Sequence, residues 1–118
     1  MAVALLNERT RECVAASVEI ARTRRTRRRG LLGRDHLDAA AALILEPCAS
    51  VHTAFMRFNI DVVFVNRGGY AVKIVENLPP WRMALSLRAH AVIEMAAGSV
   101  RRHHVAVGDR LYMSPETV

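Results

Sequence analysis

The strongest constraint on the fold is the apolar run Ile60–Val65, in which Asp61 is the only polar residue. A strand with this pattern is apolar on both faces, which predicts an inner strand covered on both sides. Residues 66–69, Asn-Arg-Gly-Gly, predict a hairpin turn because glycine readily adopts the positive φ that tight turns need. Residues 70–78 then return as the partner strand, which ends at Pro79-Pro80 because proline donates no hydrogen bond to a sheet.

Further strands are predicted on both sides of this hairpin. Residues 12–21 alternate between two faces, and residues 2–6 can pair with them across a polar turn at 7–10. Residues 89–95 and 107–113 read as later strands, the former with Ala91, Ile93 and Met95 on one face and Glu94 on the other. Residues 38–46 leave helix and strand open, since helix propensity favours 38–42 and the apolar pattern before Pro47 favours a strand over 42–46.

Two short helical segments complete the prediction. Thr23 can cap a helix that ends at Gly33, and a helical turn can cover residues 99–104. Many short strands joined by Gly, Pro and Asn turns predict a mainly β, β-rich α+β fold, a sandwich or a barrel. The length of 118 residues predicts one domain spanning 1–118, and 52% hydrophobic residues suffice for a core without metal or disulfides. Cys13 and Cys48 are therefore expected to be reduced structural residues.

The net charge of +6 arises in one segment, residues 22–29. Six of the 17 basic residues lie there, and the remaining 11 are matched by the 11 acidic residues. Clustered arginines can neutralise phosphates, so the segment is a candidate contact for an anion, a nucleic acid or an acidic partner. The candidate residues are Arg24, Arg25, Arg27, Arg28, Arg29 and the nearby Arg34. Against nucleic acid, no known binding motif occurs, and the Phe residues are expected in the strand core rather than available for base stacking.

A polar segment leads into the central strand. It brings His52, Thr53 and Arg57 close in sequence to Asp61, with Met56 as an apolar neighbour. Polar groups beside a core must be hydrogen-bonded, because bare burial costs several kcal/mol. They form either a buried network, in which Asp61 accepts bonds from Arg57 or backbone amides, or a groove whose Arg57 receives a carboxylate or phosphate. The sequence leaves both interpretations open.

Glu94 extends the candidate ligand-binding set to His52, Thr53, Met56, Arg57, Asp61 and Glu94. Glu94 and His90 are four residues apart, about 13 Å along a strand, so they cannot form an acid–base pair with each other. A hydrolase or transferase would instead need Asp61 and His52 beside Glu94. His103-His104 lacks the spacing of a metal site and reads as a solvated basic turn. We therefore expect no catalytic residue, metal or cofactor.

Four blocks in the same order resemble the bacterial and archaeal family called domain of unknown function 192. They are residues 28–34 (RRGLLGR), 51–64 (VHTAFMRFNIDVVF), 94–98 (EMAAG) and 107–111 (VGDRL), and the resemblance as a whole spans about residues 3–113. Leu32 replaces the family's usual Met and Ala96 its usual Pro, so the rigidity of the 94–98 turn is in doubt. The resemblance implies a jelly-roll-like antiparallel sandwich with one or two short helices, and no activity.

The leading functional hypothesis is a non-enzymatic binding or accessory module for an unknown small ligand or protein partner. Its site is expected beside His52, Thr53, Met56, Arg57 and Asp61, with residues 22–34 near the entrance. The chain has no apolar run long enough to span a bilayer, and residues 1–6 are too short for a signal peptide. We expect a monomeric cytoplasmic protein that does not associate with membranes.

Overall fold

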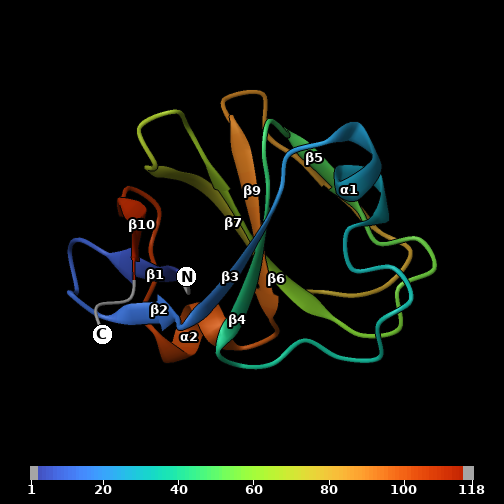
Figure 1. The fold of residues 1–118 in the computed structure, drawn as a ribbon, viewed down its shortest axis with the longest axis horizontal. Coiled ribbons are helices and arrows are strands. Elements are labelled where there is room, and N and C mark those ends of the chain that lie inside the picture. Colours follow the sequence, from blue (N-terminus) through green and yellow to red (C-terminus); the bar gives the residue numbers. More distant parts are fainter. Residues whose placement is uncertain (1–2, 116–118) are drawn as a thin grey trace.

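A five-stranded sheet forms the middle layer of the molecule in a computed structural model, which describes residues 3–115 (Figure 1). Its strand order is β3-β4-β9-β6-β7. The strands are β3 (Ser17–Ala21), β4 (Ala41–Leu45), β9 (Ala91–Ala96), β6 (Ile60–Val65) and β7 (Ala71–Leu78). Every residue of β6 is buried, which confirms the predicted inner strand covered on both faces.

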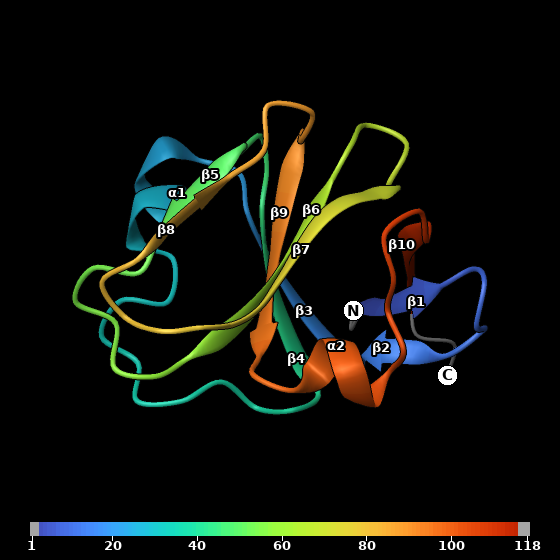
Figure 2. The same ribbon diagram turned by 180° about the vertical axis from the view of Figure 1, so that it is seen from behind.

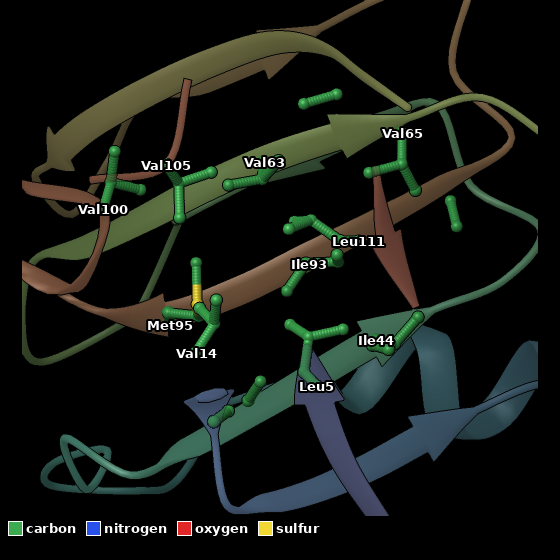
Figure 3. Close-up of a cluster of buried hydrophobic side chains, with 14 residues drawn as sticks. Leu5, Val14, Ile44, Val63, Val65, Ile93, Met95, Val100, Val105 and Leu111 are labelled. Carbon is green, nitrogen blue, oxygen red and sulfur yellow. The ribbon is translucent and has the colours of Figure 1, made fainter. Parts of the chain in front are cut away.

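One face of this sheet is covered by a three-stranded sheet and a short helix. The small sheet has the order β10-β1-β2, formed by β10 (Leu111–Pro115), β1 (Val3–Asn7) and β2 (Cys13–Ala15). Helix α2 (Ser99–Arg102) follows β9 on the same side. Figure 3 shows the core between these layers, in which Leu5, Val14 and Leu111 from the small sheet pack against residues of the middle sheet such as Val63 and Ile93.

The opposite face is covered by loops, a strand pair and the arginine-rich helix. Strands β5 (Ser50–His52) and β8 (Met83–Leu85) pair with each other, and α1 (Arg24–Arg29) lies beside β5 (Figures 1 and 2). A second apolar core joins Leu31, Val51 and Met56 from this cover to Phe64 and Val92 of the sheet. The middle sheet thus carries two separate cores, and alternate residues of each inner strand point to different ones.

The mainly β fold class is confirmed, as are two short helices within residues 3–115. The barrel alternative is wrong, since the strands of the described chain form three sheets and none closes on itself. The expectation of purely antiparallel pairing is also wrong, because β3 and β4 are parallel. Nineteen intervening residues, 22–40, make the long crossover that a parallel pair requires.

Three predicted boundaries need correction. Residues 12–21 form two strands, because the chain bends at Ala16 and β2 and β3 enter different sheets. The helix capped by Thr23 ends at Gly30 and not at Gly33. The last strand begins at Leu111, since residues 107–109 form a turn. The open choice over residues 38–46 resolves to strand β4, and the predicted pairing of residues 2–6 with the next strand is confirmed in β1 and β2.

The β6–β7 hairpin turns where the glycines predicted it. Asn66 accepts hydrogen bonds from the backbone N–H groups of Gly68 and Tyr70 through its side-chain oxygen, each at 3.0 Å. Gly69 has φ +86°, and a Cβ atom there would lie 2.6 Å from the carbonyl oxygen of Leu111. Only glycine therefore fits this position without moving the backbone of the C-terminal strand.

Candidate ligand-binding cavity

A cavity of about 290 Å³ lies between helix α1 and strand β5. Four arginines of α1 line it, namely Arg24, Arg27, Arg28 and Arg29. Apolar side chains make up much of the remaining wall, including Leu31, Leu45, Val51 and Met56. Polar groups come from Glu94 of β9 and His52 of β5. The cavity therefore combines a cationic helix with an apolar interior and one buried acid.

No residue of helix α1 is buried, so its arginine side chains are at least partly exposed to solvent. Its first turn is fixed by a capping box, in which the Thr23 hydroxyl accepts from the backbone N–H of Thr26 at 3.0 Å and the Thr26 hydroxyl accepts from that of Thr23. The anchor to the core is Leu31, just beyond the helix, which is 2% exposed. The sequence RRTRRR thus forms a helix held at its two ends while its charged side chains stay free of the core.

Glu94 is the unusual residue of the cavity. It is 3% exposed and lies on β9 opposite Leu43 of β4 and Val62 of β6, which places it on the face of the second core. Its carboxylate makes no hydrogen bond and no ion pair with any residue between 3 and 115. Buried carboxylates are normally paired or hydrogen-bonded, so a buried acid that opens on a cavity without a partner is a candidate functional group.

Burial raises the pKa of Glu94 to about 7, because removal from water disfavours the charged form. The positive charge of Arg34 opposes this effect but is outweighed. Arg34 is engaged elsewhere, since its guanidinium donates to the carboxylate of Glu19 at 2.7 Å. Near neutral pH, both the neutral and the ionised form of this acid are therefore populated.

Gly30 brings the end of α1 close to this acid. A Cβ atom at Gly30 would lie 3.8 Å from Oε1 of Glu94, and the residue has φ +47°. The backbone N–H of Gly30 donates to the carbonyl of Thr26 at 3.0 Å, which closes the last helical turn. The glycine lets the chain leave the helix directly over the carboxylate, so the arginines and Glu94 share one cavity.

The structure brings together only part of the predicted ligand-binding set. His52, Met56 and Glu94 line the cavity with Arg24, Arg27, Arg28 and Arg29. Arg25 lies on another side of α1, in a shallow hollow with Arg24 and Arg28. Arg34 contributes through its charge on Glu94 and is not part of the wall. Cys48, which also lines the cavity, donates its thiol to the carbonyl of Ser50 at 3.0 Å.

Thr53 lies outside the cavity and ties two loops together. It is fully buried, its hydroxyl donates to the carbonyl of Pro79 at 2.7 Å, and the same oxygen accepts from the backbone N–H of Arg82 at 2.8 Å. Its own backbone N–H donates to the carbonyl of Arg82, and its carbonyl accepts from Trp81. The loop that follows β5 and the loop that precedes β8 are thereby held together.

Arg57 does not pair with Asp61, contrary to one predicted network. Its guanidinium donates to Asp35 at 2.6 Å, and both side chains are largely exposed. Asp61 is fully buried and instead accepts from three backbone N–H groups, those of Asn77 at 2.8 Å, Gly98 at 3.1 Å and Val100 at 2.9 Å. The second predicted alternative, acceptance from backbone amides, describes Asp61 correctly.

Asp61 and Glu94 lie on opposite faces of the middle sheet. Asp61 pairs with Met95 across β6 and β9, and Met95 belongs to the first core, whereas Glu94 faces the second. Asp61 borders a different hollow, with Glu76, Asn77 and Gly98. The trio of Asp61, Glu94 and His52 therefore does not converge on one cavity, and the arrangement that a hydrolase or transferase would need is not assembled.

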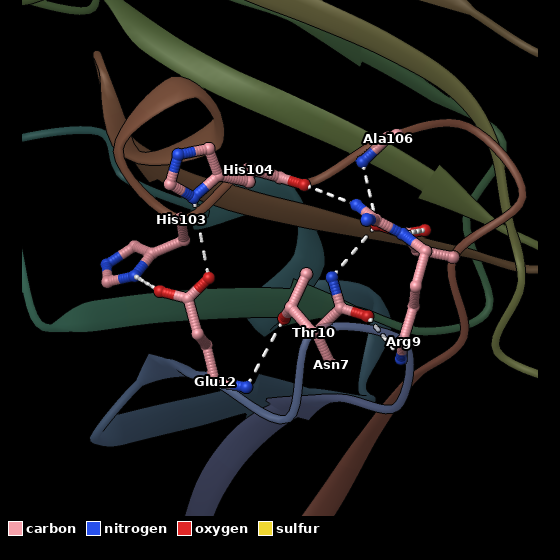
Figure 4. Close-up of polar contacts among 8 residues, drawn as sticks. Asn7, Arg9, Thr10, Glu12, His103, His104 and Ala106 are labelled. Carbon is pink, nitrogen blue, oxygen red and sulfur yellow. Dashed lines mark hydrogen bonds and ion pairs between the residues drawn. The ribbon is translucent and has the colours of Figure 1, made fainter.

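Asp109, in the residues that resemble the family's closing motif, also holds the fold together. Its carboxylate accepts from Arg9 at 2.6 Å, from the amide of Asn7 at 2.9 Å and from the backbone N–H of Ala106 at 2.8 Å. The hydrogen bond from Arg9 is the main reason that the pKa of Asp109 falls to about 2. Figure 4 shows Asn7, Arg9 and Ala106 around this network.

The two adjacent histidines both lie near Glu12, the residue that precedes strand β2. His103 and His104 each place Nδ1 near the Glu12 carboxylate, at 3.7 and 3.5 Å (Figure 4). No group of three His, Cys, Asp or Glu side chains suited to a metal occurs among residues 3–115. No helix in that range is long and apolar enough to cross a membrane.

Sequence reasoning missed an exposed aromatic pair. Phe55 is 72% exposed and Trp81 60% exposed, and their rings meet edge to face with centroids 4.6 Å apart. The expectation that all Phe residues lie in the strand core is wrong for Phe55. Both residues have positive φ, +64° and +66°, a backbone conformation that costs about 1–2 kcal/mol for residues other than glycine. Long-range bonds through Thr53 bring them together, which no local pattern in the sequence could reveal.

Comparisons with known proteins agree with the fold. A family model described as "DUF192: Uncharacterized ACR" matches residues 5–113. A UPF0127 protein of Pyrococcus furiosus is 42% identical over 64 residues, which cover 53% of this chain and 54% of that protein, so the match spans about half the length of this relative.

Two crystal structures have the same fold. A protein of unknown function from Novosphingobium aromaticivorans has a TM-score of 0.81 at 22% identity and covers 93% of this chain and 82% of that one. A putative transcription regulator from Sinorhizobium meliloti has a TM-score of 0.82 at 24% identity, covering 94% and 91%. At these identities the likeness concerns the fold alone.

Proposed function

The chain belongs to the uncharacterised DUF192 family, and we propose that it is a non-enzymatic binding module for small anionic molecules, which it holds in the cavity under α1. The observation that carries the proposal is a cavity lined by four arginines of α1, none of which pairs with an acid within residues 3–115. Arginine side chains that a fold leaves without an acidic partner are groups that an anionic ligand can satisfy.

The arginines supply the expected selectivity for an anion. Guanidinium groups form paired hydrogen bonds with carboxylate, sulfonate and phosphate oxygens, and the side chains of Arg28 and Arg29 make no hydrogen bond or ion pair with any described residue. Ligand pockets in proteins usually measure about 300–1,000 Å³, so a cavity of about 290 Å³ suits a compact molecule. Apolar walls lower the local dielectric constant, which strengthens electrostatic contacts made beside them.

The test is isothermal titration calorimetry with two probes, pyrophosphate and 1-propanesulfonate. The double variant Arg28→Gln/Arg29→Gln is expected to weaken binding by about tenfold or more, since each lost charged hydrogen bond is worth that much. The matched control is Arg67→Gln/Arg88→Gln, which removes the same charge at exposed positions outside the cavity. Equal loss in both variants, or no binding by the natural chain, contradicts the proposal.

A second candidate function is binding of single-stranded nucleic acid. The observation that favours it is the exposed Phe55–Trp81 pair, which supplies stacking surface in the loops after β5 and before β8. Bases stack on exposed aromatic rings while arginines contact the backbone phosphates. The structural neighbour from Sinorhizobium meliloti is described as a putative transcription regulator, although its likeness to this chain is limited to the fold.

Fluorescence anisotropy with a labelled oligothymidine tests this candidate. We expect salt-sensitive binding that Trp81→Ala weakens, because stacking contributes about 1–3 kcal/mol per base. Leu87→Ala is the control, since it truncates another exposed apolar side chain that is 93% exposed. Absence of binding at low salt, or an equal effect of the two substitutions, excludes this function.

A further inference from the structure

Two kinds of charged group line the cavity under α1. The arginines Arg24, Arg27, Arg28 and Arg29 come from the helix, whereas Glu94 comes from the middle sheet. Within residues 3–115, no arginine of the helix makes a hydrogen bond or an ion pair with Glu94. Apolar side chains, among them Leu31, Leu45 and Val51, line the same cavity. A ligand that satisfied both kinds of group would need two polar groups of different kinds.

The carboxyl of Glu94 defines one of these groups. Glu94 as a residue is 3% exposed, its carboxyl has no hydrogen-bond partner within residues 3–115, and the residue lines the cavity. Its environment includes His52 and Cys48 on the cavity wall, the α1 arginines and Arg34, but none of these donates to it. A hydrogen-bond donor completes such a site. A cationic donor also offsets most of the free-energy cost of removing the carboxylate from water.

Resting on the function proposed above, we propose that the natural ligand is a small zwitterion, in which an ammonium group meets Glu94 and an anionic group meets the arginines of α1, with a short apolar linker between them. The cationic donor and the anion each find the partner that the fold leaves open. A purely anionic ligand would leave the buried acid unsatisfied, and an amine without an anion would leave the arginines unused.

Two matched probes distinguish the binding of a zwitterion from the binding of any small anion. 3-Aminopropane-1-sulfonate carries an ammonium and a sulfonate on three methylenes, and 1-propanesulfonate lacks only the ammonium. Neither the sulfonate nor the alkyl ammonium changes charge near neutral pH. At about pH 8 the aminosulfonate is expected to bind the natural chain about tenfold more tightly, the contribution of one charge-assisted hydrogen bond.

The decisive variant is Glu94→Gln, with Glu76→Gln as the control because Glu76 is half-exposed and lies outside the cavity. Glu94→Gln is expected to remove the preference for the aminosulfonate while it keeps binding of 1-propanesulfonate, and the control is expected to keep both. Calorimetry near pH 7 in buffers of different ionisation enthalpy gives a second readout. The aminosulfonate should release a proton from the site on binding, because the ammonium favours the ionised acid.

The outcomes distinguish the two proposals. Equal affinity of the two probes for the natural chain overturns the zwitterion inference and leaves anion binding intact. A preference that persists in a folded Glu94→Gln variant also overturns it. The natural chain could prefer the aminosulfonate while the Arg28→Gln/Arg29→Gln variant binds it as tightly as the natural chain does. That result would contradict a role of the α1 arginines in binding and support the role of Glu94. Failure of both probes to bind contradicts both proposals.

Discussion

At the residue scale, the buried acids differ in whether their carboxylates are hydrogen-bonded within the fold. Asp61 accepts from three backbone N–H groups, and Asp109 from Arg9, Asn7 and Ala106. Glu94 has no such partner, and burial raises its pKa to about 7 while the pKa of Asp109 falls to about 2. Two buried acids therefore hold the fold together, and the third is the candidate ligand contact.

The raised pKa of Glu94 makes a prediction about stability and pH. The folded chain holds this proton more tightly than the unfolded chain, so the contribution of Glu94 is fully present below its ordinary pKa and is lost as pH rises through about 7. Glu94→Gln stays neutral at every pH. Between about pH 4 and about pH 9, the stability of the variant relative to the natural chain should improve by about 3 kcal/mol.

Denaturant unfolding at a series of pH values measures this difference. Glu76→Gln provides the control, because its half-exposed carboxylate should leave the pH profile of stability nearly unchanged. A difference between Glu94→Gln and the natural chain that stays constant with pH would show that Glu94 titrates as an ordinary exposed acid.

The Asp61 network predicts a large structural effect. Asp61→Ala removes the acceptor for three backbone N–H groups, on β7, on the turn after β9 and on α2, of which the N–H of Val100 is buried. We expect a loss of about 3 kcal/mol or more in the free energy of unfolding, because three charge-assisted hydrogen bonds are lost and a buried donor is left without a partner. Asp35→Ala removes an exposed acid that pairs with Arg57 and should cost less than about 1 kcal/mol. Similar melting temperatures for the two variants would contradict the structural role of Asp61.

At the element scale, contacts at the ends of short elements hold the walls of the cavity in place. Helix α1 has only six residues, yet Thr23 fixes its first turn and Gly30 its last, and Leu31 anchors it to the core. Strand β5 is held by β8 and by the bonds of Thr53 to the loop at residues 79–82. Rigid termini let a solvated helix hold several like charges over one cavity.

At the scale of the whole molecule, the sequence predicted local elements better than their assembly. The apolar pattern of Ile60–Val65, the hairpin glycines and the capping threonine all describe backbone preferences of neighbouring residues, and each was confirmed. The parallel pairing of β3 with β4 and the bend at Ala16 depend on contacts between distant segments. No periodicity within a short window can encode them.

The site shows the same division. His52, Met56, Glu94 and the α1 arginines were named from the sequence and share one cavity, although the sequence could not show that β9 and α1 meet there. Asp61 was grouped with His52 by nearness in sequence, but strand alternation sends its side chain to the other face of the sheet. Arg57 was paired with the wrong acid because Asp35 lies 22 residues away along the chain.

The middle sheet with two cores also explains why the molecule can hold an open cavity. The first core lies between the two sheets and is tied by the Asp61 and Asp109 networks. The second core is covered by loops, α1 and the short β5–β8 pair. The two hydrogen-bonded networks thus lie on one face of the sheet, and the candidate cavity lies on the other.

The most direct test of this account is the NMR titration of the Glu94 side-chain carboxyl, assigned by comparison with Glu94→Gln. The account predicts that this carboxyl titrates near pH 7, and that addition of 3-aminopropane-1-sulfonate moves its pKa downward while 1-propanesulfonate does not. A carboxyl that titrates near its ordinary pKa and does not respond to either compound would contradict the buried, partnerless acid on which the binding proposals depend.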